Sequence, residues 1–248
     1  MIRTSDKFHA ALSLAHRWFA FLETPAGNVE EHLGLFAKDV QLTGRRGQVC
    51  FAHGRAELER WFGAVPEEIS SHRIIHSTWT DGEGEVGKLD FVVAYQATTA
   101  HGGVSGSIIS YETVISFAND QPHFLALDKT PILPNARKEY APTWAEHRVL
   151  GFVHAALSGQ LTSQAATDAL HLALSAGSNV GVWAPAPELS RVYDAFLTVG
   201  TSEGNVYTAW WRFHDDGDAA FPALERTAPL RRQTTQDDET NSDMRSRS

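Results

Sequence analysis

The sequence predicts an α+β fold, in which a helical N-terminal stretch precedes a mostly antiparallel sheet. Apolar residues recur at helical intervals in residues 8–22. Four later segments alternate apolar and polar side chains, as half-buried strands do, and turn-forming residues separate them: 71–80, 88–99, 107–118 and 123–128. Helices followed by a run of strands are typical of α+β domains.

Length and composition limit the class of protein. The 248 residues are enough for one large domain or two smaller ones. A formal net charge of −9 argues against a nucleic-acid surface, because phosphate binding requires basic residues. The single cysteine, Cys50, fits a reducing cytoplasm. No apolar run approaches the roughly 20 residues that span a bilayer, and the N-terminus lacks a secretory signal. We therefore expect a cytoplasmic protein that binds neither nucleic acid nor membranes.

Residues 1–135 are expected to form one domain with three helices and the sheet. The first helix ends at the Thr-Pro-Ala-Gly sequence after residue 23, because proline disfavours helix in the residue before it. Residues 29–36 and 55–62 form the other two helices, with two short strands between them. Cys50 lies in the second of these strands, so we expect it to be buried as a small hydrophobe.

Residues 136–226 are expected to form a second segment that docks on the first domain. Two helices, 144–157 and 163–176, have small and apolar faces suited to close packing. His154 and His171 lie in these helices and are assigned solvent-facing or capping roles.

A hairpin is expected after these helices, with strands at 192–201 and 205–214. Of the adjacent Trp210 and Trp211, one should be core, because neighbouring strand residues face opposite ways. Residues 227–248 have almost nothing to bury and should form a disordered tail.

The order of these elements resembles that of a known family. Residues 21–40, FLET…NVEEHLGLFAKDV, are similar to the opening of the nuclear transport factor 2-like (NTF2-like, or SnoaL-like) superfamily, and YETVISF at 111–117 falls in the expected place. The resemblance covers about residues 6–133. It implies a cone, in which a curved sheet wraps the first helix and leaves a pocket open at one end. Such proteins include cyclases, isomerases, dehydratases and non-catalytic binding or dimerisation domains, so the fold does not select a function.

The sequence SHRIIHSTWT at residues 71–80 contains two histidines four residues apart. On a helix this spacing would suit a shared metal ion. On a strand, His72 and His76 would share one face at a separation of about 13 Å, whereas each zinc–nitrogen bond is about 2.1 Å. We therefore predict a strand and no metal site.

The same segment resembles the strand of scytalone dehydratase that begins with a catalytic histidine. By this likeness His72 projects into the cone and moves a proton beside a substrate carbonyl, for which a neutral imidazole is suited. Tyr95 stands where the dehydratase has a second histidine, and its phenol could donate a hydrogen bond to an enolate oxygen. The alternative is that His72 and His76 are partly exposed sheet residues without a catalytic role.

Asp90 is the reserve base, because burial would raise its pKa if it faced the cavity, although solvent exposure is the commoner state of aspartate. Tyr111 and Glu112 are adjacent on one strand, so only one of them can point inward. Tyr111 is the candidate for the pocket or core, and Glu112 would contact a ligand only if its face lined the cavity.

An apolar floor for the pocket is expected on the first helix, although ordinary core packing is the alternative for these residues. The predicted substrate contacts are Trp18, Phe19, His76, Trp79 and Glu112.

No nucleotide-binding loop, nucleophile elbow or CxxC pair is present in the sequence, so we expect no cofactor. The leading hypothesis is a cofactor-free lyase, isomerase or cyclase that acts on a small hydrophobic carbonyl compound of cyclic or polyketide-like type. The alternative is a non-catalytic ligand-binding or dimerisation protein, and a homodimer through the outer sheet face stays open.

Overall fold

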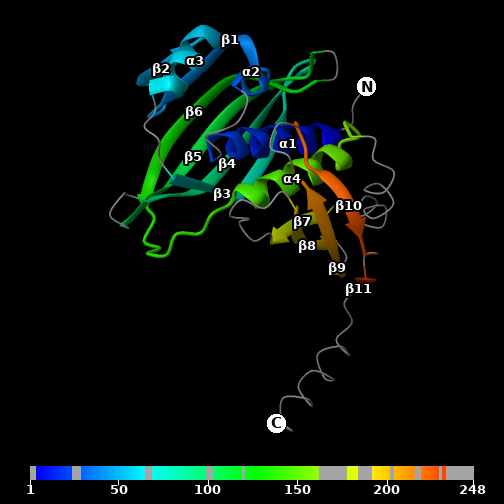
Figure 1. Ribbon diagram of the computed structural model, residues 1–248. Coiled ribbons are helices and arrows are strands. Elements are labelled where there is room, and N and C mark those ends of the chain that lie inside the picture. The colour runs from blue at the N-terminus through cyan, green and yellow to red at the C-terminus, as the bar shows by residue number, and fades with distance from the viewer. Residues whose placement is uncertain are drawn as a thin grey trace.

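The computed structural model confirms the α+β class (Figure 1). Two sheets, one large and one small, lie on either side of a central pair of helices. The structure describes these residues: 4–23, 29–64, 69–98, 103–118, 121–161, 178–183, 192–201, 204–215, 219–228 and 231–232.

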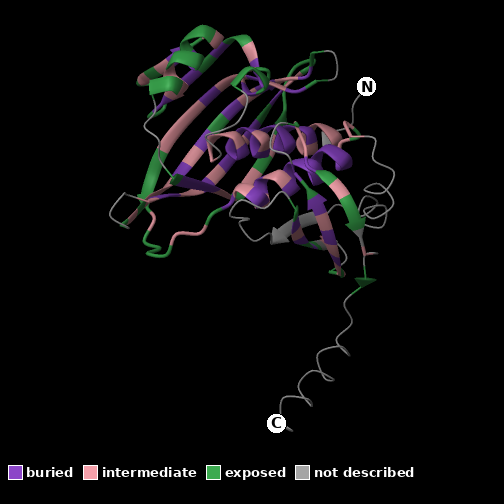
Figure 2. Cartoon of the chain, in the orientation of Figure 1, coloured by how far each residue is buried: buried purple, intermediate pink, exposed green. Residues whose placement is uncertain are grey.

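The three predicted N-terminal helices are α1 (Thr4–Leu22), α2 (Val29–Leu33) and α3 (Arg55–Ala64). α1 is amphipathic only in part, since most of its side chains are buried between the large sheet and a later helix. Figure 2 shows buried residues along the middle of α1 and half-buried residues at both of its ends. Of these helices, α1 is the one that positions the candidate site.

The large sheet has the strand order β2-β1-β6-β5-β4-β3, in which β1 and β6 are parallel and all other neighbours antiparallel. All four predicted main strands are present. The bounds are β1 (Phe36–Gly44), β2 (Val49–His53), β3 (Ile69–Asp81), β4 (Val86–Thr98), β5 (Val104–Ser116) and β6 (His123–Pro134). Because β3 is an edge strand, one side of its backbone is free to bond with other parts of the chain.

A β-bulge between Ile74 and His76 interrupts the alternation of β3. Ile74 pairs with the buried Val93, and Ser77 with the buried Phe91, so Ile75 is the extra residue. A bulge places two residues opposite one and reverses the face of every later side chain. His72 therefore faces the interior while His76 is exposed on the outer face, and the prediction that they share a face is wrong.

The concave side of the large sheet is filled mainly by aromatic and aliphatic side chains. Trp18 and Phe19 of α1 pack against Phe91 of β4 and Tyr111 of β5. Phe91 and Tyr111 stack with ring centroids 4.9 Å apart. The middle of the cone is thus a core, which leaves the ends of the strands as the places where a ligand could approach.

The second half begins with α4 (Trp144–Leu157), which has the predicted bounds, and a small sheet of order β10-β9-β8-β7 covers one side of it. The expected hairpin is present as β8 (Val192–Thr201) and β9 (Val206–His214). Trp211 is fully buried against Phe152 and Phe213, whereas Trp210 is half-buried, as the alternation predicts.

Three strands of the second half were not expected from the sequence: β7 (Ser178–Trp183), β10 (Ala223–Thr227) and β11 (Arg231–Arg232). Thr227 is the last residue of β10, and β11 pairs with β9, so the prediction of a disordered tail is wrong for Thr227 and for the two residues of β11. The predicted helix at 163–176, with His171, lies outside the described residues, as does 233–248.

α1 and α4 lie side by side in antiparallel orientation (Figure 1). Ser13 Oγ donates a 2.8 Å hydrogen bond to the carbonyl oxygen of Gly151. At Gly151 a Cβ atom would lie 3.6 Å from Arg17 Cγ and 3.7 Å from His16 Cβ, so the two helix backbones come close here. The halves of the chain therefore meet through a tight helix–helix contact.

Two further observations concern the surface. Cys50 is exposed on β2, so the prediction that it is buried is wrong. Within the described part of the chain, no helix has the length and apolar content needed to cross a membrane.

Candidate active site

A buried carboxylate–imidazole pair lies at the end of the cone where β3 begins. Glu23 follows the last turn of α1, and its side chain is only 2 % exposed. Its Oε1 is 3.3 Å from His72 Nδ1 and accepts a 2.6 Å hydrogen bond from the backbone N–H of His72. The free edge of β3 makes this second bond available, because the N–H of His72 has no strand partner on that side.

The ring of His72 is held in one orientation. It stacks on Phe19 at a centroid distance of 4.8 Å and lies 5.1 Å from the ring of Tyr95. Among the described residues, its ring hydrogen bonds involve Nδ1 alone. The His72 side chain is 9 % exposed. One nitrogen is thus occupied by Glu23, and Nε2 has no hydrogen-bond partner among the described residues.

Two residues of the second half complete the surroundings of Glu23. Thr143 Oγ1 lies 2.8 Å and 2.9 Å from the two carboxylate oxygens, and it also accepts a 3.1 Å hydrogen bond from the backbone N–H of His72. His147 Nε2 is 3.5 Å from Glu23 Oε1, and its other nitrogen, Nδ1, is 2.8 Å from His16 Nδ1. The carboxylate therefore has partners from both halves of the chain.

The electrostatics favour an ionised Glu23 and a neutral His72. Burial by itself would raise the pKa of Glu23, but the neighbouring His147 and His72 lower that pKa to about 2. Burial lowers the pKa of His72, and the hydrogen bond to Glu23 opposes this only in part. At neutral pH the imidazole is thus in its basic form.

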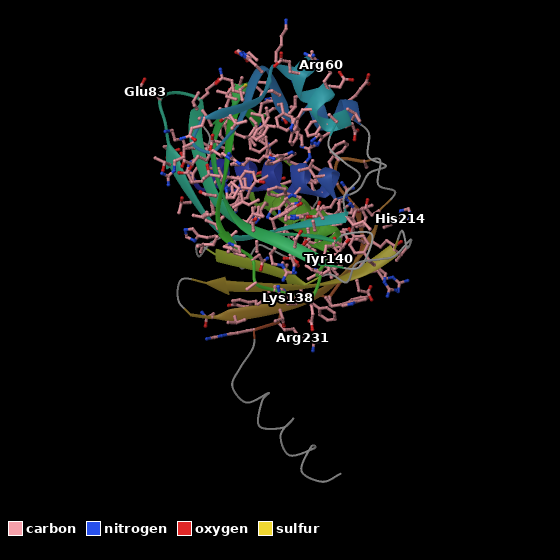
Figure 3. All side chains as sticks on the ribbon, turned by 90° about the vertical axis from the view of Figure 1, so that its left-hand side faces the viewer. Arg60, Glu83, Lys138, Tyr140, His214 and Arg231 are labelled. Atoms are coloured by element: carbon pink, nitrogen blue, oxygen red, sulfur yellow. The ribbon has the colours of Figure 1, made fainter. Side chains whose placement is uncertain are left out.

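A linker between β6 and α4 runs across the adjoining strand ends. The hydroxyl of Tyr140 donates to the carbonyl oxygen of Ser70, and Asn135 Nδ2 donates to that of Tyr95. The amide of Gln96 bonds the linker backbone at residues 139 and 141. Figure 3 shows Tyr140 and Lys138 between the strands of the large sheet and those of the small sheet. The linker is therefore fastened along the ends of β3 and β4.

This geometry favours one histidine tautomer. An ionised carboxylate can only accept, so His72 Nδ1 carries the proton that faces Glu23. The lone pair is then on Nε2. A carboxylate on one imidazole nitrogen also stabilises the positive charge that forms when the other nitrogen takes up a proton. The pair is arranged as a general base.

Three of the sequence-predicted site residues face away from the interior. Asp90 and Glu112 pair across β4 and β5 on the outer face, where Asp90 is half-buried and Glu112 exposed. His76 is exposed on the same face because of the bulge in β3. These side chains do not line the cone.

The other predicted residues are spread through the interior. Trp18, Phe19 and Tyr111 are core, and burial raises the pKa of the Tyr111 phenol. Phe19 lies between Tyr111 and His72 and contacts both rings. Trp79 packs on Phe117 near the far end of β3, about 23 Å from His72 along the strand. Of the predicted set, Tyr95 and Phe19 contact His72.

The sequence did not identify Glu23, Thr143 or His147 as site residues. The one local signal for Glu23 is a carboxylate directly after a helix whose other residues are mostly apolar. Thr143 and His147 carry no local signal, because they reach Glu23 from 120 and 124 positions away. The expectation that His154 faces solvent is wrong, since it is buried against His9 and His16.

The histidines form pairs and do not converge on one point. Within the described residues, no group of three or more histidine, cysteine, aspartate or glutamate side chains is placed to hold a metal ion. The contacts of Glu23 and His72 are hydrogen bonds and ring stacking.

No protein-family model matches the sequence, and no curated protein matches it. Solved structures do resemble it over about half its length. A putative scytalone dehydratase from Novosphingobium aromaticivorans is 14% identical, with a TM-score of 0.47 over 55% of this chain and 91% of that chain. A putative dehydratase of the NTF2-like family from Streptomyces avermitilis is 13% identical, with a TM-score of 0.45 over 53% and 99% of the two chains. A hexachlorocyclohexane dehydrochlorinase is 12% identical, with a TM-score of 0.46 over 54% and 91%. A protein of the NTF2-like family that the sequence resembles is thus among the structures similar to about half of this chain.

Proposed function

We propose that the protein is a cofactor-independent acid–base enzyme, a lyase or isomerase, in which His72 removes a proton from carbon. One observation carries this proposal. His72 Nδ1 is held by the buried carboxylate of Glu23, while Nε2 is left without a hydrogen-bond partner among the described residues and the side chain is 9 % exposed. A base that is held at one nitrogen and free at the other is suited to proton abstraction.

In the proposed reaction His72 Nε2 takes a proton from a carbon next to a carbonyl group. The electron pair of the broken C–H bond moves to the carbonyl oxygen and gives an enolate. The enolate then either expels a group from the neighbouring carbon or receives the proton back at a different carbon. Tyr95, whose ring is 5.1 Å from that of His72, is the candidate hydrogen-bond donor to the enolate oxygen.

The surroundings favour a small apolar ligand. Phe19 and Tyr95 contact the His72 ring, and aromatic side chains fill the middle of the cone. A ligand would therefore bind at the strand end near His72 and not deep inside the sheet. A cyclic or polyketide-like carbonyl compound has the apolar surface to match these rings.

Hydrogen–deuterium exchange tests the proposal without a known substrate. A panel of cyclic ketones and polyketide-like carbonyl compounds is incubated with the protein in D₂O, and deuterium at the carbon next to the carbonyl is measured by mass spectrometry. We expect exchange with at least one compound. His72→Gln should slow it by ~100-fold or more, the usual contribution of a general base.

Two further variants sharpen this test. Glu23→Gln should slow exchange by about 10-fold or more, because it removes a charge-assisted hydrogen bond to the base. His76→Gln, on the outer face, is the matched control and should leave the rate unchanged. Exchange that survives His72→Gln would contradict the assignment of the base. A compound that binds without exchange would instead indicate a non-catalytic ligand-binding protein.

A further inference from the structure

We propose that Thr143 and His147, both from the second half of the chain, are positioning residues for the base. They hold the Glu23 carboxylate in place, so that the free nitrogen of His72 stays unprotonated. This inference rests on the proposed function, because it concerns how the same carboxylate–imidazole pair is maintained. It implies that the first half of the chain does not contain the complete site.

Without these partners, the ionised Glu23 side chain would be electrostatically unfavourable at its position. It follows the C-terminal turn of α1, where unpaired carbonyl groups carry partial negative charge and repel a carboxylate. The carboxylate is also removed from water. Donors from elsewhere must therefore compensate for both effects, and His72 alone comes from the first half.

Thr143 connects both members of the pair. Its single hydroxyl proton is within reach of both carboxylate oxygens of Glu23, at 2.8 Å and 2.9 Å. Its oxygen accepts a hydrogen bond from the backbone N–H of His72. One side chain thus fixes the distance between Glu23 and the strand that bears His72.

His147 acts from the opposite side. Thr143 is the residue before the first turn of α4, and the backbone N–H of His147 bonds to its carbonyl oxygen at 2.9 Å. Both positioning residues therefore lie on one helical turn, at an end where the helix dipole favours a nearby anion. Among the described residues, Glu23 is faced by His72 from β3, by Thr143 just before α4 and by His147 from α4. Tyr140 of the linker and Glu146 of α4 are close enough to feel its charge.

The hydrogen bonds also order the tautomers. His147 Nε2 lies 3.5 Å from Glu23 Oε1 and forms no hydrogen bond among the described residues, while its Nδ1 shares a 2.8 Å hydrogen bond with His16 Nδ1. With the proton of His72 on Nδ1, its Nε2 carries the lone pair. The carboxylate thus lies between two imidazoles, and its hydrogen bond with His72 Nδ1 favours the His72 tautomer that the reaction requires.

His147 does not itself reach a ligand. Its Nε2 is fully buried, and the side chain is 2 % exposed. The same is true of the hydroxyl of Thr143, whose residue is 1% exposed and whose contacts are Glu23 and His72. Both therefore act through Glu23 and His72, not on the substrate.

The test uses the full-length chain labelled with ¹⁵N-histidine, and NMR reports the tautomer of His72 at pH 7 without any substrate. In the wild type we expect the proton on Nδ1. Thr143→Val and His147→Phe each remove a partner of Glu23, so the ratio of the two His72 tautomers should shift by ~10-fold or more. In a second sample labelled with ¹³C-glutamate, the pKa of the Glu23 carboxyl should be higher in both variants than in the wild type, because each variant removes a neighbour of the carboxylate.

Rescue and control variants separate positioning from folding. Thr143→Ser keeps the hydroxyl and His147→Gln keeps a donor, so both should restore the wild-type tautomer ratio. His154→Gln changes another buried histidine of the same helix that does not contact Glu23, and it should have no effect on His72. If His147→Phe does not fold, the comparison of Thr143→Val with Thr143→Ser tests the positioning role.

The outcomes distinguish the two proposals. A wild-type His72 with its proton on Nε2 would overturn the assignment of the base itself. A wild-type Nδ1–H tautomer that persists unchanged in both Thr143→Val and His147→Phe would overturn the positioning role and leave the proposed function standing.

Discussion

His32 shows how a single residue can be buried at a cost to stability. Both of its ring nitrogens are fully buried and form no hydrogen bond with the described residues. The ring stacks on Phe21 at 3.7 Å and meets Phe36 and Phe62 edge-on. Burial, and then the charge of Arg17, lower the pKa of His32 to about 3, so the ring is neutral at neutral pH. An unsatisfied N–H in an aromatic environment is unfavourable.

Replacing His32 with phenylalanine should therefore stabilise the protein. The ring contacts are kept while the unpaired N–H is removed, and we expect the free energy of unfolding to rise by ~1–2 kcal/mol at pH 7. Urea denaturation measures this change in the free energy of unfolding. His76→Phe, at an exposed position, should change stability by less than about 0.5 kcal/mol. A loss of stability in His32→Phe would show that the imidazole has a polar partner after all.

At the scale of elements, α1 and α4 are joined by a row of four histidines: His9, His154, His16 and His147. The Nδ1 atoms of the two outer contacts are 3.0 Å apart in His9–His154 and 2.8 Å apart in His16–His147. His154 and His16 stack in between. Both helices carry their histidines seven residues apart, which is two helical turns, so an antiparallel arrangement matches them pairwise. In each pair one Nδ1 atom donates a hydrogen bond and the other accepts it. Protonation of the accepting nitrogen would break this hydrogen bond and place a positive charge in the buried contact.

The row predicts loss of stability in mild acid. Burial lowers the pKa of His9, His16 and His154, and that of His154 to about 3. In the unfolded chain these side chains take up protons near pH 6.5. Below that pH the unfolded state binds more protons, so the free energy of unfolding falls as pH falls, by up to about 1.4 kcal/mol per pH unit for each such histidine.

Urea midpoints at pH 8, 7, 6 and 5.5 check this prediction. The double variant His9→Leu, His154→Leu removes one pair and should lessen the slope below pH 6.5. Substitution of the exposed His53 and His76 should leave the slope as it is. Equal stability at pH 7 and pH 5.5 in the wild type would rule out the row as an acid-sensitive contact.

Gly151 gives a second prediction for the same pair of helices. A Cβ atom there would make ordinary van der Waals contacts at 3.6–3.8 Å with Arg17, His16 and Ser13. Gly151→Ala should therefore be tolerated and should raise the free energy of unfolding by ~0.5–1 kcal/mol, since glycine is unfavourable inside a helix. Gly151→Leu, whose side chain has no room, should lose ~1–3 kcal/mol. Thermal unfolding of the two variants compares these effects, and equal stability would contradict the close approach.

At the scale of the whole molecule, the two sheets each have a core of their own, and the two helices join them. The core of the first half contains Trp18, and that of the second contains Trp211. The contact between halves includes the histidine row, the Ser13–Gly151 hydrogen bond and the partners of Glu23. Separation of the halves would expose these buried polar groups together, so the halves are expected to unfold as one unit.

Fluorine NMR with 5-fluorotryptophan tests this cooperativity in urea. The signals of Trp18 and Trp211, assigned by their phenylalanine variants, should disappear with the same midpoint. Thr143→Val should lower both midpoints together, although Thr143 contacts neither tryptophan core directly. Two separate midpoints would show that the halves are independent domains.

The sequence by itself determined the elements whose pattern is local. The helical period in residues 8–22 and the alternation in 88–99 reappear as α1 and β4, and residues 144–157 form α4 with the predicted bounds. These segments are long and strongly periodic, so the side-chain pattern alone specifies which face is buried. The interior position of His72 was expected from the resemblance to scytalone dehydratase and not from the alternation, and the residue is buried.

Only the tertiary structure decided what surrounds His72. One extra residue at Ile75 reverses the face of the rest of β3, and alternation cannot reveal a bulge. Glu23 lies 49 positions from His72, and Thr143 lies 71 positions from it. Their contact depends on how α1, α4 and the edge of the sheet pack. The local pattern of a sequence specifies a face but not the distant residue that packs against it, and the candidate site is made of such distant residues.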